Sequence, residues 1–160
     1  AYVTRVGEGP FPTEVTDAAG QHMLEKGHEF GTTTGRQRRC GWMDLVALRY
    51  AVRVNGLTEL AVTKLDVLSG LKTLRVCVAY RTRDGEELTE LPDNQTVFHN
   101  CVPVYTDLDG WDEDITECRD HDDLPARAQA YIDMIADAIQ IPVALIGTGQ
   151  GRHQIIDLAL

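Results

Sequence analysis

The segment from residue 124 to residue 147 constrains the fold most, because a helix and a strand follow each other directly there. Its apolar residues form one stripe at helical spacing: Leu124, Ala128, Tyr131, Ile132, Ile135, Ala136 and Ile139. Pro142 prevents the helix from continuing, and the apolar run over 142–147 predicts a strand. A one-sided helix beside a short apolar strand favours an α/β fold with a sheet and flanking helices.

The rest of the chain agrees with that class. A helix is predicted over 17–29, and a second helix over 43–54 is apolar nearly all round, which is typical of a buried helix. Further strands are predicted at 60–66, 74–80, 101–106 and 154–160, with an Asp-Gly hairpin turn at 84–85. We interpret the acidic stretch 107–123 as a solvated loop.

Composition excludes several classes of protein. The 160 residues are 43% hydrophobic, so the chain can bury a core as one domain or as a piece of a larger one. No apolar run reaches the roughly 20 residues that cross a bilayer, and no signal peptide opens the sequence. The net charge of −10 argues against a general nucleic-acid binder.

Charge and cysteine content narrow the expected setting. Residues 1–83 hold 12 Lys/Arg against 8 Asp/Glu, so the first half suits an anionic small molecule. The four cysteines form no CxxC pair, which favours reduced thiols in a cytoplasmic protein over a zinc or redox motif. The chain begins at Ala1 without a methionine, and we expect it to start within a longer protein.

The loop GTTTGRQRR (31–39) is the first candidate site. Its threonines supply hydroxyl donors, its glycines free backbone N–H groups, and Arg36, Arg38 and Arg39 supply guanidinium forks suited to carboxylate or phosphate. The loop is therefore interpreted as an anion site, with a flexible basic surface loop as the alternative.

Two shorter motifs follow strands. Lys64-Leu65-Asp66 ends an apolar strand, where the Asp66 carboxylate can accept from both N–H groups of a guanine edge. Gly147-Thr148-Gly149 follows the strand PVALI and gives a tight turn suited to a flat ligand. The alternatives are a solvated strand end and an ordinary turn. Too few residues follow Gly151 for a dinucleotide-binding unit, and no metal site is expected from the histidines or the acidic stretch.

Taken together, these segments resemble one known family. YVTRVGEGPFPTE (2–14), EFGTTTGRQRRCGWMD (29–44), LTELAVTKLDVLSGLK (57–72) and CVAY (77–80) look like the C-terminal part of adenylosuccinate synthetase. The resemblance implies the C-terminal portion of a P-loop-NTPase-like fold, a mixed sheet with flanking helices. Residues 1–56 would form a substrate-loop and helical region. Residues 57–160 would hold the strands, the acidic loop, the helix 124–139 and the guanine-pocket turn.

Membership would also imply a reaction. GTP, inosine monophosphate (IMP) and L-aspartate would give adenylosuccinate, GDP and phosphate, through 6-phosphorylation of the base and displacement by the aspartate amine. The resemblance further implies magnesium, a homodimer, a cytoplasmic location and a place in AMP biosynthesis, with no nucleic-acid or membrane partner.

The family's binding residues carry over to matching positions. The L-aspartate loop would be Thr32, Thr33, Thr34, Gly35, Arg36, Gln37 and Arg38. Arg36, Val6 and Gly7 would contact IMP. The GTP-binding set would be Arg38, Lys64, Leu65, Asp66, Gly147, Thr148 and Gly149. Many members have Ser where this chain has Gly147, and some have Arg where it has Gln37.

The resemblance also indicates what this chain lacks. No segment matches the family's glycine-rich phosphate loop, its aspartate base and magnesium ligand, or its catalytic histidine. We therefore expect no catalytic residue and no metal ligand in this part, and an isolated chain that is inactive. A stand-alone, non-catalytic guanine-nucleotide binding module remains the alternative, beside an interaction domain with an inactive ligand loop.

Overall fold

The computed structural model describes residues 1–158, and these fall into two compact units. One unit comprises Ala1, Ala51–Leu74 and the chain from Asp107 onward, and is called here the base unit. The other comprises Tyr2–Tyr50 and Arg75–Thr106, and is called the loop unit. Each unit is discontinuous in sequence because α2 (Leu45–Asn55), β5 (Thr73–Arg81) and β7 (Val102–Asp109) pass from one to the other.

The base unit is built on a three-stranded sheet in the order β4-β8-β9. Strand β4 (Leu60–Val62) is parallel to β8 (Val143–Gly147), and β9 (Ile155–Asp157) is antiparallel to β8. The predicted strand over 60–66 ends early, because the chain leaves the sheet after Val62 and forms the 3₁₀ helix η1 (Leu65–Leu68). The strand predicted over 154–160 is present in its first part, and residues 159–160 lie outside the described residues.

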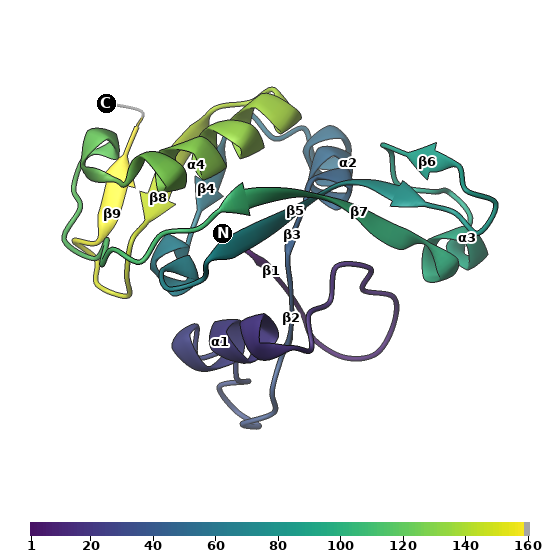
Figure 1. The fold of residues 1–160 in the computed structure, drawn as a ribbon, viewed down its shortest axis with the longest axis horizontal. Helices are drawn as coiled ribbons and strands as arrows, with labels where there is room; N and C mark the ends of the chain where they lie inside the picture. The colour runs from purple at the N-terminus through teal and green to yellow at the C-terminus, as the bar shows by residue number, and fades with distance from the viewer. Residues whose placement is uncertain (159–160) are drawn as a thin grey trace. The chain divides into compact units, whose positions relative to one another are not determined.

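Helix α4 (Ala126–Ile139) confirms the apolar stripe and lies beside this sheet (Figure 1). Its buried residues are Ala128, Tyr131, Ile132, Ile135 and Ile139. The helix begins after Pro125, whereas Asp123 belongs to the short 3₁₀ helix η2 (His121–Asp123). It ends at Gln140, whose positive φ of 57° turns the chain toward Pro142.

The acidic stretch 107–123 differs from the solvated loop that we expected. Its first residues continue β7, and Trp111 and Ile115 are fully buried. The Trp111 indole N–H donates to Ser69 Oγ at 2.8 Å, and the Trp111 ring meets Tyr131 edge-on. Trp111 and Ile115 hold the segment 107–123 against the core. Two apolar residues among many carboxylates do not form a helical or strand pattern, so the sequence does not reveal this burial.

The loop unit contains a four-stranded mixed sheet and a separate two-stranded ladder. In the sheet, β5 pairs with β3 (Met43–Asp44), β6 (Glu87–Leu88) and β7, and the β5–β6 hairpin turns at Gly85 as predicted. The ladder joins β1 (Val3–Arg5) to β2 (Arg39–Gly41) in antiparallel fashion. Two helices complete the unit. Helix α1 (Ala18–Lys26) is capped by Asp17, and the short α3 (Gln95–Asn100) is capped by Asn94.

The helix predicted over 43–54 is only partly buried. Residues 43–44 form β3, and α2 then buries Leu45 and Val46, whereas Tyr50 and Val54 are 39% and 55% exposed. At the start of α2, the Asp44 carboxylate accepts the Ala47 N–H and the Tyr80 hydroxyl, and burial raises the pKa of Asp44. Apolar composition alone therefore overstated how far this helix is covered.

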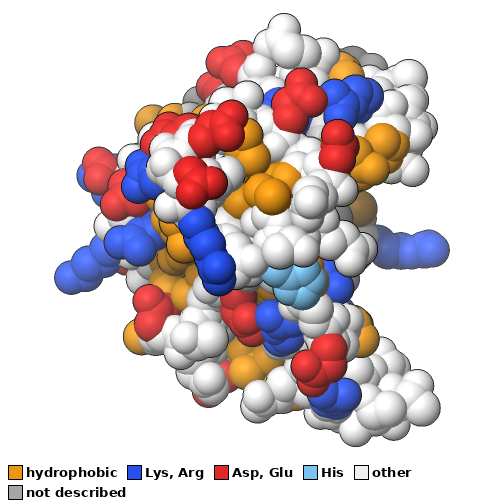
Figure 2. Space-filling view, turned by 90° about the vertical axis from the view of Figure 1, so that its right-hand side faces the viewer, with side chains coloured by type: hydrophobic (Ala, Val, Ile, Leu, Met, Phe, Trp, Pro, Cys, Tyr) orange, Lys and Arg blue, Asp and Glu red, His pale blue; other side chains and the backbone are white. Residues whose placement is uncertain are grey.

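Taken together, the mixed sheets and flanking helices confirm the predicted α/β class. All four cysteines are free thiols. On the face drawn in Figure 2, basic and acidic side chains are interspersed with small hydrophobic areas, and neither sign dominates it. Within residues 1–158 no helix is long and apolar enough to cross a membrane.

Candidate functional site

The Thr32–Arg38 loop is a closed turn in the loop unit. The Gly35 N–H donates to Gly31 O at 2.7 Å, the Gly31 N–H donates to Arg36 O at 2.8 Å, and Gly35 has a positive φ of 65°. The Arg36 N–H also donates to Thr34 Oγ1 at 3.3 Å. The loop thus has a defined backbone, while its threonine side chains and Gln37 remain exposed.

Arg36 is the exposed cation of this loop. No hydrogen bond or ion pair joins its guanidinium to another residue within the described part of the chain. It lines a pocket of about 450 Å³ with Glu14 and Arg38, and a second of about 310 Å³ with Gly7 and Arg5. Gly7 therefore lies near Arg36, whereas Val6 lines neither pocket and is 79% exposed.

Arg38 forms an ion pair with a buried glutamate, Glu29. Its Nη1 donates to Glu29 Oε2 at 3.0 Å, and Glu29 is only 2% exposed. The other oxygen of Glu29 accepts the Tyr2 hydroxyl at 2.6 Å. Sequence reasoning missed Glu29, because a single buried acid without periodic neighbours is not distinguishable from a surface acid before the fold is known.

Arg39 is not available as a third anion-binding fork. Its Nε and Nη2 donate to the two Glu14 oxygens at 2.8 and 2.6 Å, and its Nη1 donates to the Gly9 carbonyl at 2.9 Å. The hydrogen bond from Arg39 lowers the pKa of Glu14, although burial acts in the opposite direction. Arg39 thus fastens the segment 7–14 to β2, so our expectation for its guanidinium was wrong.

The second cluster lies in the base unit, at the carboxyl ends of the parallel strands β4 and β8. Val62 is paired with Ile146, so Lys64-Leu65-Asp66 and Gly147-Thr148-Gly149 leave the sheet side by side. A Cβ on Gly147 would lie 3.3 Å from Thr63 Cα, which shows how closely the two backbones approach. Carboxyl ends of adjacent parallel strands are where α/β sheets bind ligands.

The residues of this cluster differ in exposure. Lys64 has a left-handed backbone with φ of 61°, Leu65 is fully buried, and Asp66 is half-buried in the first turn of η1. Thr148 is also fully buried, and its hydroxyl has no hydrogen-bond partner among the residues that the structure describes.

No metal site accompanies either cluster. Between residues 1 and 158 there is no group of three or more His, Cys, Asp or Glu side chains that could hold a metal ion. The available chemistry is anion binding in the loop unit and recognition of a flat polar edge in the base unit. The Thr32–Arg38 loop and the Lys64–Asp66 segment belong to different units.

Comparison with known proteins identifies the family. The sequence model of adenylosuccinate synthetase matches residues 1–156. This chain belongs to the adenylosuccinate synthetase family. The synthetase of Pelotomaculum thermopropionicum is 57% identical over 156 residues, and that of Halothermothrix orenii is 54% identical over 156 residues. Each alignment covers 98% of this chain and 36% of the relative.

A solved structure of this family supports the fold. Fully ligated adenylosuccinate synthetase from Plasmodium falciparum superposes with a TM-score of 0.93 at 43% identity. The match covers 98% of this chain and 38% of that one. The chain therefore spans little more than a third of the length of its adenylosuccinate synthetase relatives.

Proposed function

We propose that this chain supplies the L-aspartate loop and the guanine pocket of an adenylosuccinate synthetase. The parent reaction would be the GTP-dependent ligation of L-aspartate to IMP, giving adenylosuccinate, GDP and phosphate. The single observation that carries the proposal is the meeting of Lys64–Asp66 and Gly147–Gly149 at the carboxyl ends of β4 and β8. In this proposal residues 1–56 carry the loop and residues 57–160 carry the pocket.

The chemistry of the base cluster favours guanine. The Asp66 carboxylate can accept two N–H groups from a guanine edge, whereas adenine offers no such pair and would leave the carboxylate unpaired. The Lys64 stem can cover one face of the base, and the Gly147–Gly149 backbone can approach it because two of its three residues lack side chains. Leu65 anchors the segment in the core.

The chemistry of the loop cluster favours small carboxylates and phosphates. Thr32, Thr33 and Thr34 are exposed, and the guanidinium of Arg36, in the same loop, has no hydrogen-bond or ion-pair partner in the described chain. In the proposed assignment, Thr32–Arg38 hold the aspartate carboxylates, Arg36 with Val6 and Gly7 contacts IMP, and Arg38 reaches the GTP phosphates. The Glu29 ion pair orients Arg38 before any ligand arrives.

Magnesium enters the proposal through the family alone. Within residues 1–158 no group of three or more acidic, histidine or cysteine side chains converges. No chemical step is therefore assigned through a metal here. A homodimer, a cytoplasmic location and a role in AMP biosynthesis complete the proposal and rest on the family alone.

The decisive experiment compares GDP and ADP binding before and after Asp66→Asn. We expect GDP binding to weaken about ten- to hundred-fold while ADP binding barely changes, because the amide leaves one guanine N–H without an acceptor. Asp133→Asn, an exposed change on α4, is the matched control and should alter neither affinity. Titration calorimetry measures both.

An unchanged GDP-to-ADP ratio in Asp66→Asn would remove the guanine assignment. The alternative, a non-catalytic guanine-nucleotide binding module, predicts the same change in the GDP-to-ADP ratio but no turnover. An activity assay on the full-length protein, not a binding assay, therefore distinguishes it from the synthetase. A purely structural domain predicts that Arg36→Ala and Asp66→Ala both leave ligand binding unchanged.

A further inference from the structure

The turn between β8 and β9 has no regular secondary structure, yet its backbone is closed by hydrogen bonds. The Thr148 N–H donates to Gln154 O at 2.9 Å, and the Gln154 N–H donates to Gly151 O at 2.9 Å. Gly147 ends β8 and this turn begins with Thr148 and Gly149, which together form the proposed wall of the guanine pocket. Its shape therefore depends on where Gln154 is placed.

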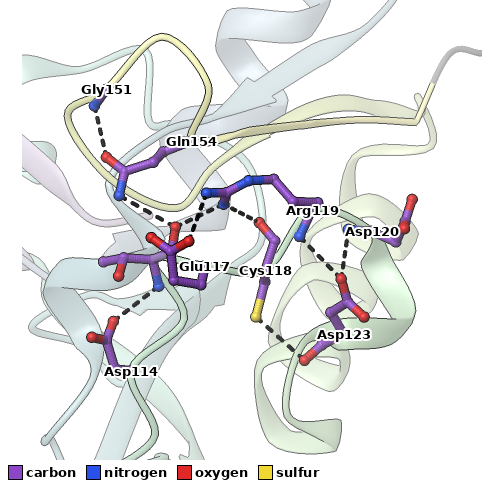
Figure 3. Close-up of polar contacts among 9 residues, drawn as sticks. Asp114, Glu117, Cys118, Arg119, Asp120, Asp123, Gly151 and Gln154 are labelled. Atoms are coloured by element: carbon purple, nitrogen blue, oxygen red, sulfur yellow. Dashed lines mark hydrogen bonds and ion pairs between the residues drawn. The ribbon is translucent and has the colours of Figure 1, made fainter.

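The Gln154 side chain connects this turn to a different part of the base unit (Figure 3). Its Oε1 accepts the Gly151 N–H at 2.8 Å, and its Nε2 donates to Thr116 O at 3.2 Å. We call these two hydrogen bonds the Gln154 bridge. The bridge needs one acceptor and one donor on the same planar group, which an amide has and a carboxylate lacks.

The far end of the bridge is fixed. Thr116 O also accepts from Arg119 Nη1 at 2.8 Å, and Arg119 donates further to Cys118 O at 2.9 Å (Figure 3). The Asp123 carboxylate accepts the backbone N–H groups of Arg119 and Asp120, which lowers the pKa of Asp123. Next to Thr116, Ile115 is fully buried. The bridge thus ends on the segment 115–123, which is held by its own hydrogen bonds and by the burial of Ile115.

The near end of the bridge touches the proposed pocket wall directly. A Cβ on Gly149 would lie 2.4 Å from Gln154 Oε1, so the amide is packed against the Gly149 backbone. Glycine is the residue that allows this approach. The side chain of Gln154 therefore contacts Gly149 and bonds Gly151, and its backbone bonds Thr148.

We infer that Gln154 is a positioning residue for guanine nucleotides: the Gln154 bridge holds the Gly147–Gly149 backbone where the base must meet it. Gln154 does not itself touch the nucleotide in this account. The inference rests on the proposed function, since it presumes that Gly147–Gly149 form the wall of a guanine pocket.

The test uses the full-length protein that contains this sequence. Gln154→Met keeps the volume and removes both bonds, while Gln154→Glu keeps the acceptor and removes the donor. We expect GDP affinity to fall about ten-fold in Gln154→Met, with Gln154→Glu also weakened, and IMP affinity to stay within two-fold of the original. Gln129→Met is the matched control, because Gln129 in α4 donates to a backbone carbonyl, Leu124 O, away from the turn.

Each outcome decides the inference. Unchanged GDP affinity in both Gln154 variants would overturn it, even if their unfolding temperatures fall. Parallel loss of GDP and IMP binding would also overturn it, because the role of Gln154 would then be general stability. Asp66→Asn is measured beside them. If Asp66→Asn shifts the GDP-to-ADP ratio and the Gln154 variants do not, only the positioning role fails. If Asp66→Asn shifts nothing, the proposed function itself fails.

Discussion

Two ion pairs in the loop unit fix the directions of Arg38 and Arg39, two of the three arginines at positions 36–39. Glu29 holds Arg38 and Glu14 holds Arg39, so two of the three guanidinium groups already have fixed directions. Of these two, only Arg38 is proposed to meet an anion, and an arginine held in place loses less conformational entropy on binding than one that must first be ordered. Arg36 has no such partner within residues 1–158 and is the group whose direction a ligand would set.

The Glu14–Arg39 pair should make stability depend on acid. The pKa of Glu14 is lowered in the folded protein, so its ionised form stabilises the fold above its ordinary pKa of 4.5. That stabilisation is lost as the pH falls through the lower, folded pKa. We expect Glu14→Gln to reduce the free energy of unfolding by about 1 kcal/mol at pH 7, and the difference to vanish at the acid end.

Urea unfolding followed in steps from pH 7 to pH 3 measures this difference. Glu87→Gln is the control, because Glu87 pairs with Arg81 at a more exposed place and should have a smaller effect. A difference between Glu14→Gln and the original chain that stays constant down to pH 3 would contradict the argument.

The residue types in the sequence predict a candidate anion loop at Thr32–Arg38, but they do not show which residues hold that loop in place. Threonine, glycine and arginine in one short run are visible in the sequence, and so is Asp66 after an apolar strand. Glu29 and Gln154 are single polar residues whose partners lie on other segments. Their roles could not be predicted, because each role exists only once the fold brings the partner close.

At the scale of elements, local periodicity predicted α4 and the apolar strands, and the structure confirms them. It did not predict that β4 and β8 are parallel neighbours, although this pairing creates the candidate base pocket. Strand pairing between distant segments depends on competition among all strands, which no local pattern records. The same limit applies to the acidic stretch, where only Trp111 and Ile115 mark its burial.

Helix α4 should contribute to stability through its apolar stripe. Ile135 is fully buried, so Ile135→Ala removes methyl groups and leaves a cavity in the base unit. We expect a loss of about 2–5 kcal/mol in the free energy of unfolding, measured by urea denaturation. Asp133→Ala lies on the exposed face of the same helix and should change stability by less than about 0.5 kcal/mol. Equal effects of the two changes would mean that α4 does not pack as described.

At the scale of the whole molecule, the proposed binding groups are divided between two units of a chain that covers about a third of its relatives. Phosphoryl transfer requires positioned phosphates and stabilisation of the charge that develops on them. The described residues offer cationic and hydroxyl groups for binding, and no cluster for a metal ion. We therefore expect that ligand binding by this sequence can be measured separately from turnover.

Residues 1–160 alone should release no phosphate above background when given GTP, IMP, L-aspartate and magnesium. The reason is our expectation, from the family resemblance, that the phosphate loop, the aspartate base and the catalytic histidine lie outside these residues. A coupled phosphate assay measures it, with an intact adenylosuccinate synthetase as the positive control. Release that depends on both GTP and L-aspartate would show that this part of the family's chain is sufficient for catalysis.

The sequence contains two tryptophans, and each unit has one of them in its interior: Trp42 in the loop unit and Trp111 in the base unit. Trp111 is hydrogen-bonded to Ser69, the residue directly after the 3₁₀ helix η1 that contains Asp66. Fluorescence therefore offers a separate optical reporter for each unit. With Trp42 replaced by Phe, the remaining emission follows the surroundings of the base pocket, and with Trp111 replaced it follows the anion loop. A single cuvette titration can then tell which of the two units a given ligand has entered.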